Sequence, residues 1–112
     1  MKDIFGLKRG LLDDLELKNT RVVVLGLQIR NSWKYKQWRV KILKRDRHIC
    51  QICKEMIGTE VDHYPVSFSE ILSKNNITTI GEAYACFELW DTDGGRTVCS
   101  PCHRGTESYG VH

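Results

Sequence analysis

Two Cys-x-x-Cys pairs constrain the fold of this chain more than any other feature of its sequence. They are Cys50-Gln51-Ile52-Cys53 and Cys99-Ser100-Pro101-Cys102, and 45 residues separate them. Two residues between the cysteines of a tight turn let both sulfur atoms face one ion, and two such turns supply four tetrahedral ligands. We therefore expect one structural Zn²⁺ bound by Cys50, Cys53, Cys99 and Cys102.

Chain length and composition narrow the class of protein. A chain of 112 residues forms one domain with a modest core, which a structural metal would strengthen. The N-terminal segment does not resemble a signal peptide, so we expect a cytoplasmic protein whose thiols stay reduced. The longest apolar stretch, residues 22–27, is too short to span a bilayer, and no membrane association is expected.

The segment of residues 30–47 is strongly basic. It holds eight basic residues and one acidic residue, a net charge of +7, whereas the whole chain carries +3 and the remainder therefore −4. Lysine and arginine supply sequence-independent affinity for a phosphate backbone by releasing counterions. The segment fits a polyanionic partner such as DNA, although a solvated helix face would have the same composition.

Hydrophobic periodicity predicts a small α+β domain. The apolar run of residues 22–29 predicts a strand within an N-terminal extension, residues 1–29, to which we assign no chemistry. Ser32 is a suitable N-cap for a helix that ends at about Arg45. One face of this helix carries three core candidates: Tyr35, Trp38 and Ile42.

The chain beyond the first cysteine pair should contain further short elements. We expect a strand over residues 60–64, a helix over 68–75, a second helix over 79–89 and a turn over 91–95. The fifth cysteine, Cys86, falls within the second of these helices and is expected to be a small buried residue.

Three residues near the cysteines could carry hydrolytic chemistry. Asp62 and His63 are neighbours on a predicted strand, so their side chains should point to opposite faces. This favours divided roles, with Asp62 on a metal ion and His63 on a water molecule. His103 follows the second cysteine pair directly and would open a helix, where it could complete the metal site.

These motifs together resemble the HNH endonucleases, in their zinc-containing, free-standing or intron-encoded form common in bacteriophage genomes. The strongest matches are Cys50-x-x-Cys53, Val61-Asp62-His63-Tyr64 and Gly95-Arg96-Thr97-Val98-Cys99-x-x-Cys102-His103. The resemblance covers roughly residues 30–110, including 33–39, 68–90 and 106–110. The combination is specific, whereas either cysteine pair alone would be a weak signal.

The resemblance implies a ββα-metal, treble-clef-like core within an HNH nuclease domain of residues 30–112. It implies that His63 is the general base, and that Asp62 and His103 bind a catalytic Mg²⁺, Mn²⁺ or similar divalent cation. Such an enzyme would hydrolyse DNA phosphodiester bonds in the cytoplasm. If the chain is phage-encoded, this is the cytoplasm of the bacterial host, and phage DNA-processing proteins are possible partners. Basic residues would contact DNA or remain surface charges: Lys34, Lys36, Arg39, Lys41, Arg96 and Arg104.

One position departs from the family pattern. HNH relatives usually carry an asparagine five residues before the third cysteine, and this chain has Gly94 there. Glycine cannot brace the loop or orient the histidine, so a non-catalytic, zinc-stabilised DNA-binding module is the alternative function. The sequence Cys99-x-x-Cys102-His103 also matches a c-type haem attachment site, but that interpretation leaves the first cysteine pair unexplained.

Overall fold

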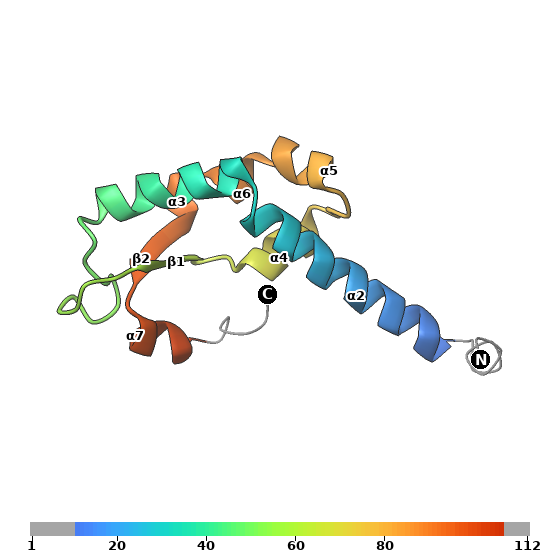
Figure 1. Cartoon of the computed structure of the whole chain (residues 1–112), viewed down its shortest axis with the longest axis horizontal. Coiled ribbons are helices and arrows are strands. Elements are labelled where there is room, and N and C mark those ends of the chain that lie inside the picture. Colours follow the sequence, from blue (N-terminus) through green and yellow to red (C-terminus); the bar gives the residue numbers. More distant parts are fainter. Residues whose placement is uncertain (1–10, 107–112) are drawn as a thin grey trace.

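Short helices surround a two-stranded sheet in the computed structural model, which describes residues 11–106 and their side chains from residue 20 onward (Figure 1). The α+β class predicted from the sequence is therefore confirmed. The elements in chain order are α2 (Leu11–Arg30), α3 (Trp33–Arg45), β1 (Glu60–His63), α4 (Phe68–Lys74), α5 (Ile80–Ala85), α6 (Phe87–Trp90), the 3₁₀ helix η1 (Thr92–Gly94), β2 (Gly95–Val98) and α7 (Ser100–Arg104).

The two strands form an antiparallel pair at the centre of the domain. Asp62 lies opposite Arg96, and His63 lies opposite Gly95. Helix α3 contacts both strands and α7 contacts β1, and Figure 1 shows these two helices on opposite sides of the sheet. The strand predicted over residues 60–64 is confirmed by β1.

Helix α3 forms as the sequence predicts. The Ser32 hydroxyl accepts a hydrogen bond from the Tyr35 backbone N–H at 3.2 Å, which caps the first turn. The buried face of α3 carries Trp38 and Ile42, which pack with Val61 of β1 in one hydrophobic cluster. This helix therefore fixes the position of β1.

The strand predicted over residues 22–29 is wrong, because these residues belong to helix α2. Valine-rich runs favour strands by propensity, but tertiary packing overrides that preference. Leu25 and Ile29 are four residues apart on a helix and are both buried, in a cluster shared with Phe68 and Ile71. Within the described part of the chain, no helix has the length and apolar character needed to cross a membrane.

The single helix predicted over residues 79–89 is interrupted at Cys86. Helix α5 begins with a capping box between Thr79 and Glu82, and Cys86 then adopts extended backbone angles before α6 begins. The interruption leaves helix-end carbonyl groups available to other donors. One of them, the Ala83 carbonyl, accepts a hydrogen bond from Trp90 Nε1 at 2.8 Å. By contrast, the helix predicted over residues 68–75 is confirmed by α4, which ends at Lys74.

Helix η1 and strand β2 replace the simple turn predicted over residues 91–95. Gly95 begins β2 with φ of −143°, so its backbone needs no left-handed conformation. Close packing explains why a glycine occupies position 95, because a Cβ there would collide with the Trp38 and Ile42 side chains. At Gly94, a Cβ would meet only the Glu88 carbonyl oxygen, at 3.8 Å.

This contrast predicts unequal effects of two neighbouring alanine substitutions. Gly95→Ala should lower the free energy of unfolding by about 1–3 kcal/mol, because the added methyl group overpacks the contact between α3 and β2. Gly94→Ala is the matched control and should change it far less. Urea denaturation of both variants measures the difference, and equal stability would contradict the packing argument.

Candidate functional site

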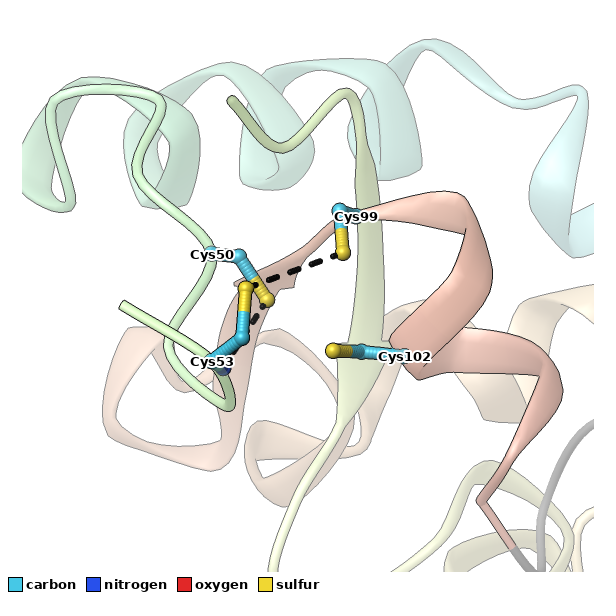
Figure 2. A group of neighbouring side chains, drawn as sticks. All are labelled: Cys50, Cys53, Cys99 and Cys102. Carbon is cyan, nitrogen blue, oxygen red and sulfur yellow. Dashed lines mark hydrogen bonds between the residues drawn. The ribbon is translucent and has the colours of Figure 1, made fainter. Parts of the chain in front are cut away.

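The four cysteines of the two pairs come together as the sequence predicts. Their sulfur atoms all lie within 4.8 Å of one another, and the sulfurs of Cys53 and Cys99 are 4.0 Å apart. Figure 2 shows the sulfur atoms from the two turns facing one another. Tetrahedral Zn²⁺ with Zn–S bonds of about 2.3 Å requires sulfur atoms about 3.8 Å apart. The cluster therefore fits a structural metal such as zinc.

Local backbone structure shapes the first cysteine turn. Lys54 has a positive φ of 63°, and its N–H donates to the Cys50 carbonyl at 2.9 Å, which closes the turn. The backbone N–H groups of Ile52 and Cys53 point toward the Cys50 sulfur, at 3.4 and 3.5 Å. Such donors stabilise a thiolate, so the turn is arranged for a negatively charged ligand.

The second cysteine turn follows directly from the sheet. Cys99 comes after the last residue of β2 and caps α7, and Cys102 lies within that helix. The Gln51 backbone N–H donates to the Thr97 carbonyl at 2.8 Å, which joins the two turns. The cysteine cluster therefore closes one end of the β1–β2 unit.

The four thiols influence one another's ionisation. Burial opposes ionisation of Cys50, but N–H donors from Cys53, Cys99 and Ile52 outweigh it and lower the pKa of Cys50 to about 6. A hydrogen bond with the Cys99 side chain, and then burial, raise the pKa of Cys102 to about 12. One thiolate forms readily, whereas further negative charge is opposed until a cation offsets it.

Asp62 lies on β1 and is bound by an arginine that the sequence analysis did not pair with it. Its side chain is 3% exposed, and its two carboxylate oxygens accept hydrogen bonds from Arg96 at 3.0 and 3.4 Å. The Arg96 guanidinium also lies 3.7 Å from the centre of the Tyr64 ring. The strand register brings Asp62 and Arg96 directly opposite each other, so Arg96 neutralises the carboxylate.

His63 points to the other face of β1, as expected from its position next to Asp62. Its ring stacks on Trp38, with centroids 4.1 Å apart and planes 15° apart. Its Nε2 lies 2.9 Å from the Leu89 carbonyl oxygen at the end of α6. A carbonyl can only accept, so Nε2 carries the proton and Nδ1 is the basic nitrogen.

His103 is buried in α7, which begins at Ser100 rather than at His103 as the sequence predicted. Its Nδ1 lies 2.5 Å from a carboxylate oxygen of Glu60. Glu60 and Asp62 are two residues apart on β1, so they share one face of the strand. Sequence reasoning missed Glu60, although its strand spacing from Asp62 was a usable signal.

A small cavity adjoins Asp62 and His63. Its volume is about 20 Å³, room for about one water molecule. Arg30 stacks over Phe68 at 4.4 Å, and burial lowers the pKa of Arg30. The cavity is lined by Arg30, Tyr35, Val61, Asp62, His63 and Phe68. Arg30 and Tyr35 could not be placed here from the sequence, because the packing of α2 brings Arg30 to the cavity and the packing of α3 brings Tyr35.

The predicted DNA-contacting residues divide into two groups. Lys34, Lys36 and Lys41 are exposed along α3. The other residues also bond within the protein: Arg39 donates to the Thr59 carbonyl, and Arg104 donates to the Ser100 hydroxyl at 2.8 Å. All three lysines are exposed, and the Lys34 ammonium also lies 5.5 Å from the centre of the Trp90 ring.

Among residues 20–106, whose side chains the structure describes, the four cysteines form the only close group of three or more potential metal ligands. Asp62 and His103 are not drawn into a comparably close group with a third histidine, cysteine or carboxylate. Most of the motif at residues 106–110 lies outside the described residues, as does His112. The chain matches no protein-family model, no curated protein and no solved structure.

The cysteine cluster predicts a stability that depends on zinc. The protein should contain one zinc per chain, and strong chelators should unfold it, because structural zinc contributes about 10–16 kcal/mol to folding in small domains. Cys50→Ser should lose the metal, whereas Cys86→Ser, outside the cluster, should retain it. Elemental analysis and circular dichroism measure both effects. A wild-type fold indifferent to chelation would contradict the metal assignment.

Proposed function

We propose that this protein is a metal-dependent DNA endonuclease of the HNH type that hydrolyses phosphodiester bonds. The observation that carries the proposal is the environment of His63. The Leu89 carbonyl bonds one nitrogen of this histidine, and the Trp38 indole stacks on its ring. His63 and Asp62 both line a cavity that has room for about one water molecule. These neighbours fix the orientation of the ring, as a general base requires.

The arrangement of β1, β2 and α7 supports a ββα core. The two strands are antiparallel, α7 follows β2 with only Cys99 between them, and α7 contacts β1. Asp62 and His63 lie on one strand and His103 lies on the helix, as the HNH resemblance implies. The cysteine cluster would act as the scaffold of this unit.

His63 would act as the general base. A phosphodiester is hydrolysed by an in-line water, whose proton must be accepted by a group that titrates near neutral pH. Neutral imidazole meets that requirement, and the hydrogen bond from Nε2 to the Leu89 carbonyl assigns the accepting role to Nδ1. Stacking on Trp38 holds the ring in one orientation, and Trp38 is itself fixed by donating to the Asp91 carbonyl at 3.1 Å.

Asp62 and His103 would hold a catalytic Mg²⁺ or Mn²⁺ ion. The Asp62 carboxylate oxygens are ligands that such hard cations prefer, His103 would add an imidazole nitrogen, and the Glu60 carboxylate orients His103 in the manner of an outer-sphere partner. The bound cation would neutralise charge on the departing 3′ oxygen. Arg96 competes for the Asp62 carboxylate, so binding a cation there requires that this ion pair loosen.

The basic face of α3 would bind the DNA backbone. Lys34, Lys36 and Lys41 are exposed on a helix that packs directly on β1 and β2. Phosphate contacts of this kind provide affinity without sequence specificity and weaken as salt rises. The proposal therefore assigns DNA affinity to α3 and chemistry to the β1–β2–α7 unit.

A non-catalytic DNA-binding module is the second candidate function. It is favoured by Gly94, which supplies no side chain at the middle position of the HNH motif, and by the Arg96 ion pair on Asp62. This candidate predicts DNA binding without cleavage at any concentration of Mg²⁺ or Mn²⁺.

The base assignment predicts the effect of removing one imidazole. His63→Ala should abolish cleavage of plasmid DNA in Mn²⁺ while zinc content and DNA affinity are retained, since only proton abstraction is lost. His48→Asn is a matched control, because His48 is exposed and asparagine tolerates its positive φ of 59°. Full activity in His63→Ala would exclude His63 as the base, and an inactive wild-type protein that still binds DNA would favour the second candidate.

Restoring the missing amide provides a gain-of-function test. Gly94 lies beside the His63 strand, where its carbonyl accepts from the Tyr64 N–H at 2.9 Å, and a side chain there meets no obstacle. Gly94→Asn should brace this loop and raise the cleavage rate about tenfold, within the usual range for groups around a metal site.

Asp93→Ala tests whether the neighbouring carboxylate has taken over the bracing role. If it has, this substitution should slow cleavage in the present chain and have little effect when it is combined with Gly94→Asn. A folded, zinc-loaded Gly94→Asn protein that cuts no faster than its parent would show that the amide is not needed.

A further inference from the structure

Helix α2 carries apolar side chains that the domain does not cover. Leu25 and Ile29 are buried in the core, but their neighbours on the helix are not. The exposed fractions are 57% for Val22, 57% for Val23, 47% for Val24 and 55% for Leu27. Leu27 lies four residues after Val23 and three after Val24, so these three side chains are neighbours on the helix and form an exposed patch, whereas Val22 lies on the side of Leu25. Exposed aliphatic patches mark interaction sites.

An apolar groove lies beside this patch. A cavity of about 350 Å³ separates α2 from the segment before α5, and it is lined by Arg21, Val22, Leu25, Ile77 and Thr78. Aliphatic side chains form most of its wall, and Arg21 adds one exposed cationic group at the rim. The groove therefore suits an apolar segment that also carries negative charge.

The first half of α2 has that composition. Its sequence is Leu11-Leu12-Asp13-Asp14-Leu15-Glu16-Leu17, with four leucines and three acidic residues. Figure 1 shows this half of the helix running away from the domain. Isolated helical segments shorter than about 12–15 residues are marginally stable in water, so contact with a partner would stabilise this half of the helix.

We infer that two copies of this chain pair through α2 in antiparallel orientation. The leucine-rich half of each helix would lie in the groove of the other copy, with its acidic residues near the partner's Arg21. The 20-residue helix is about 30 Å long, enough to reach across such a contact. The leucine-rich half of α2 from each copy would occupy the groove of the other copy. The same surface is then used twice, so the interface is self-complementary and forms a closed dimer.

Charge favours this orientation over the parallel one. The first half of α2 carries three acidic residues and one lysine, whereas its second half carries Arg21 and Arg30 and no acidic residue. Antiparallel pairing places unlike halves together, and parallel pairing would place like halves together. The inference is independent of the proposed nuclease activity, because it uses no residue of the catalytic assignment.

Sedimentation of the full, zinc-loaded chain over a range of concentrations tests the inference. The wild-type protein should be a dimer, and the double variant Val22→Glu, Val23→Glu should be a monomer with an unchanged circular dichroism spectrum. Phe87→Glu is the matched control: Phe87 is 79% exposed on α6 and is not among the residues that line the groove, and its replacement should leave the dimer intact.

Charge reversal tests the orientation. Arg21→Glu should raise the dimer dissociation constant about tenfold or more. Adding Asp13→Lys and Asp14→Lys to this variant should return the dissociation constant to the wild-type value. A wild-type chain that stays monomeric at about 100 μM, far above ordinary dimer affinities, would overturn the inference. A dimer unaffected by the Val22 and Val23 changes would also overturn it.

Discussion

Four sulfur atoms, from two turns that are far apart in the sequence, lie within 4.8 Å of one another. The rest of the structure depends on which of these thiols ionise and on what balances their negative charge. N–H donors favour one thiolate at Cys50, whereas neighbouring sulfurs raise the pKa of Cys102. A divalent cation bound by the four cysteines would remove that conflict and would also join residues 50–53 to residues 99–102. Because the second turn is continuous with β2 and α7, the cluster sets the position of the strand pair and of the helix after it.

The register of that strand pair determines the chemistry available on its two faces. Pairing Asp62 with Arg96 places an ion pair on one face, and on that face Glu60 also contacts His103. His63 lies on the other face, against Trp38 and the end of α6. The domain thereby places the His63 imidazole and the carboxylates of Glu60 and Asp62 on different faces of one strand, and the proposed nuclease mechanism would use these groups for different steps.

Short-range signals in the sequence were sufficient to predict the cysteine cluster and helix α3. The cysteine spacing predicted the cluster, and the Ser32 cap with its apolar face predicted α3, because turns and helix ends are encoded by neighbouring residues. The helical state of residues 22–29 was missed because it depends on burial of Leu25 and Ile29 by other elements. The partners of Asp62 and His103 were missed because they depend on strand register and helix packing.

The proposed function requires that Asp62 and His103 bind one divalent cation. The most direct measurement is anomalous diffraction from crystals of the zinc-loaded protein soaked in Mn²⁺. The account predicts a zinc peak among the four cysteines and a separate manganese peak within bonding distance of Asp62 and His103, about 2.2 Å, with the Arg96 ion pair loosened. No manganese at that position, with Asp62 still bound to Arg96, would contradict it.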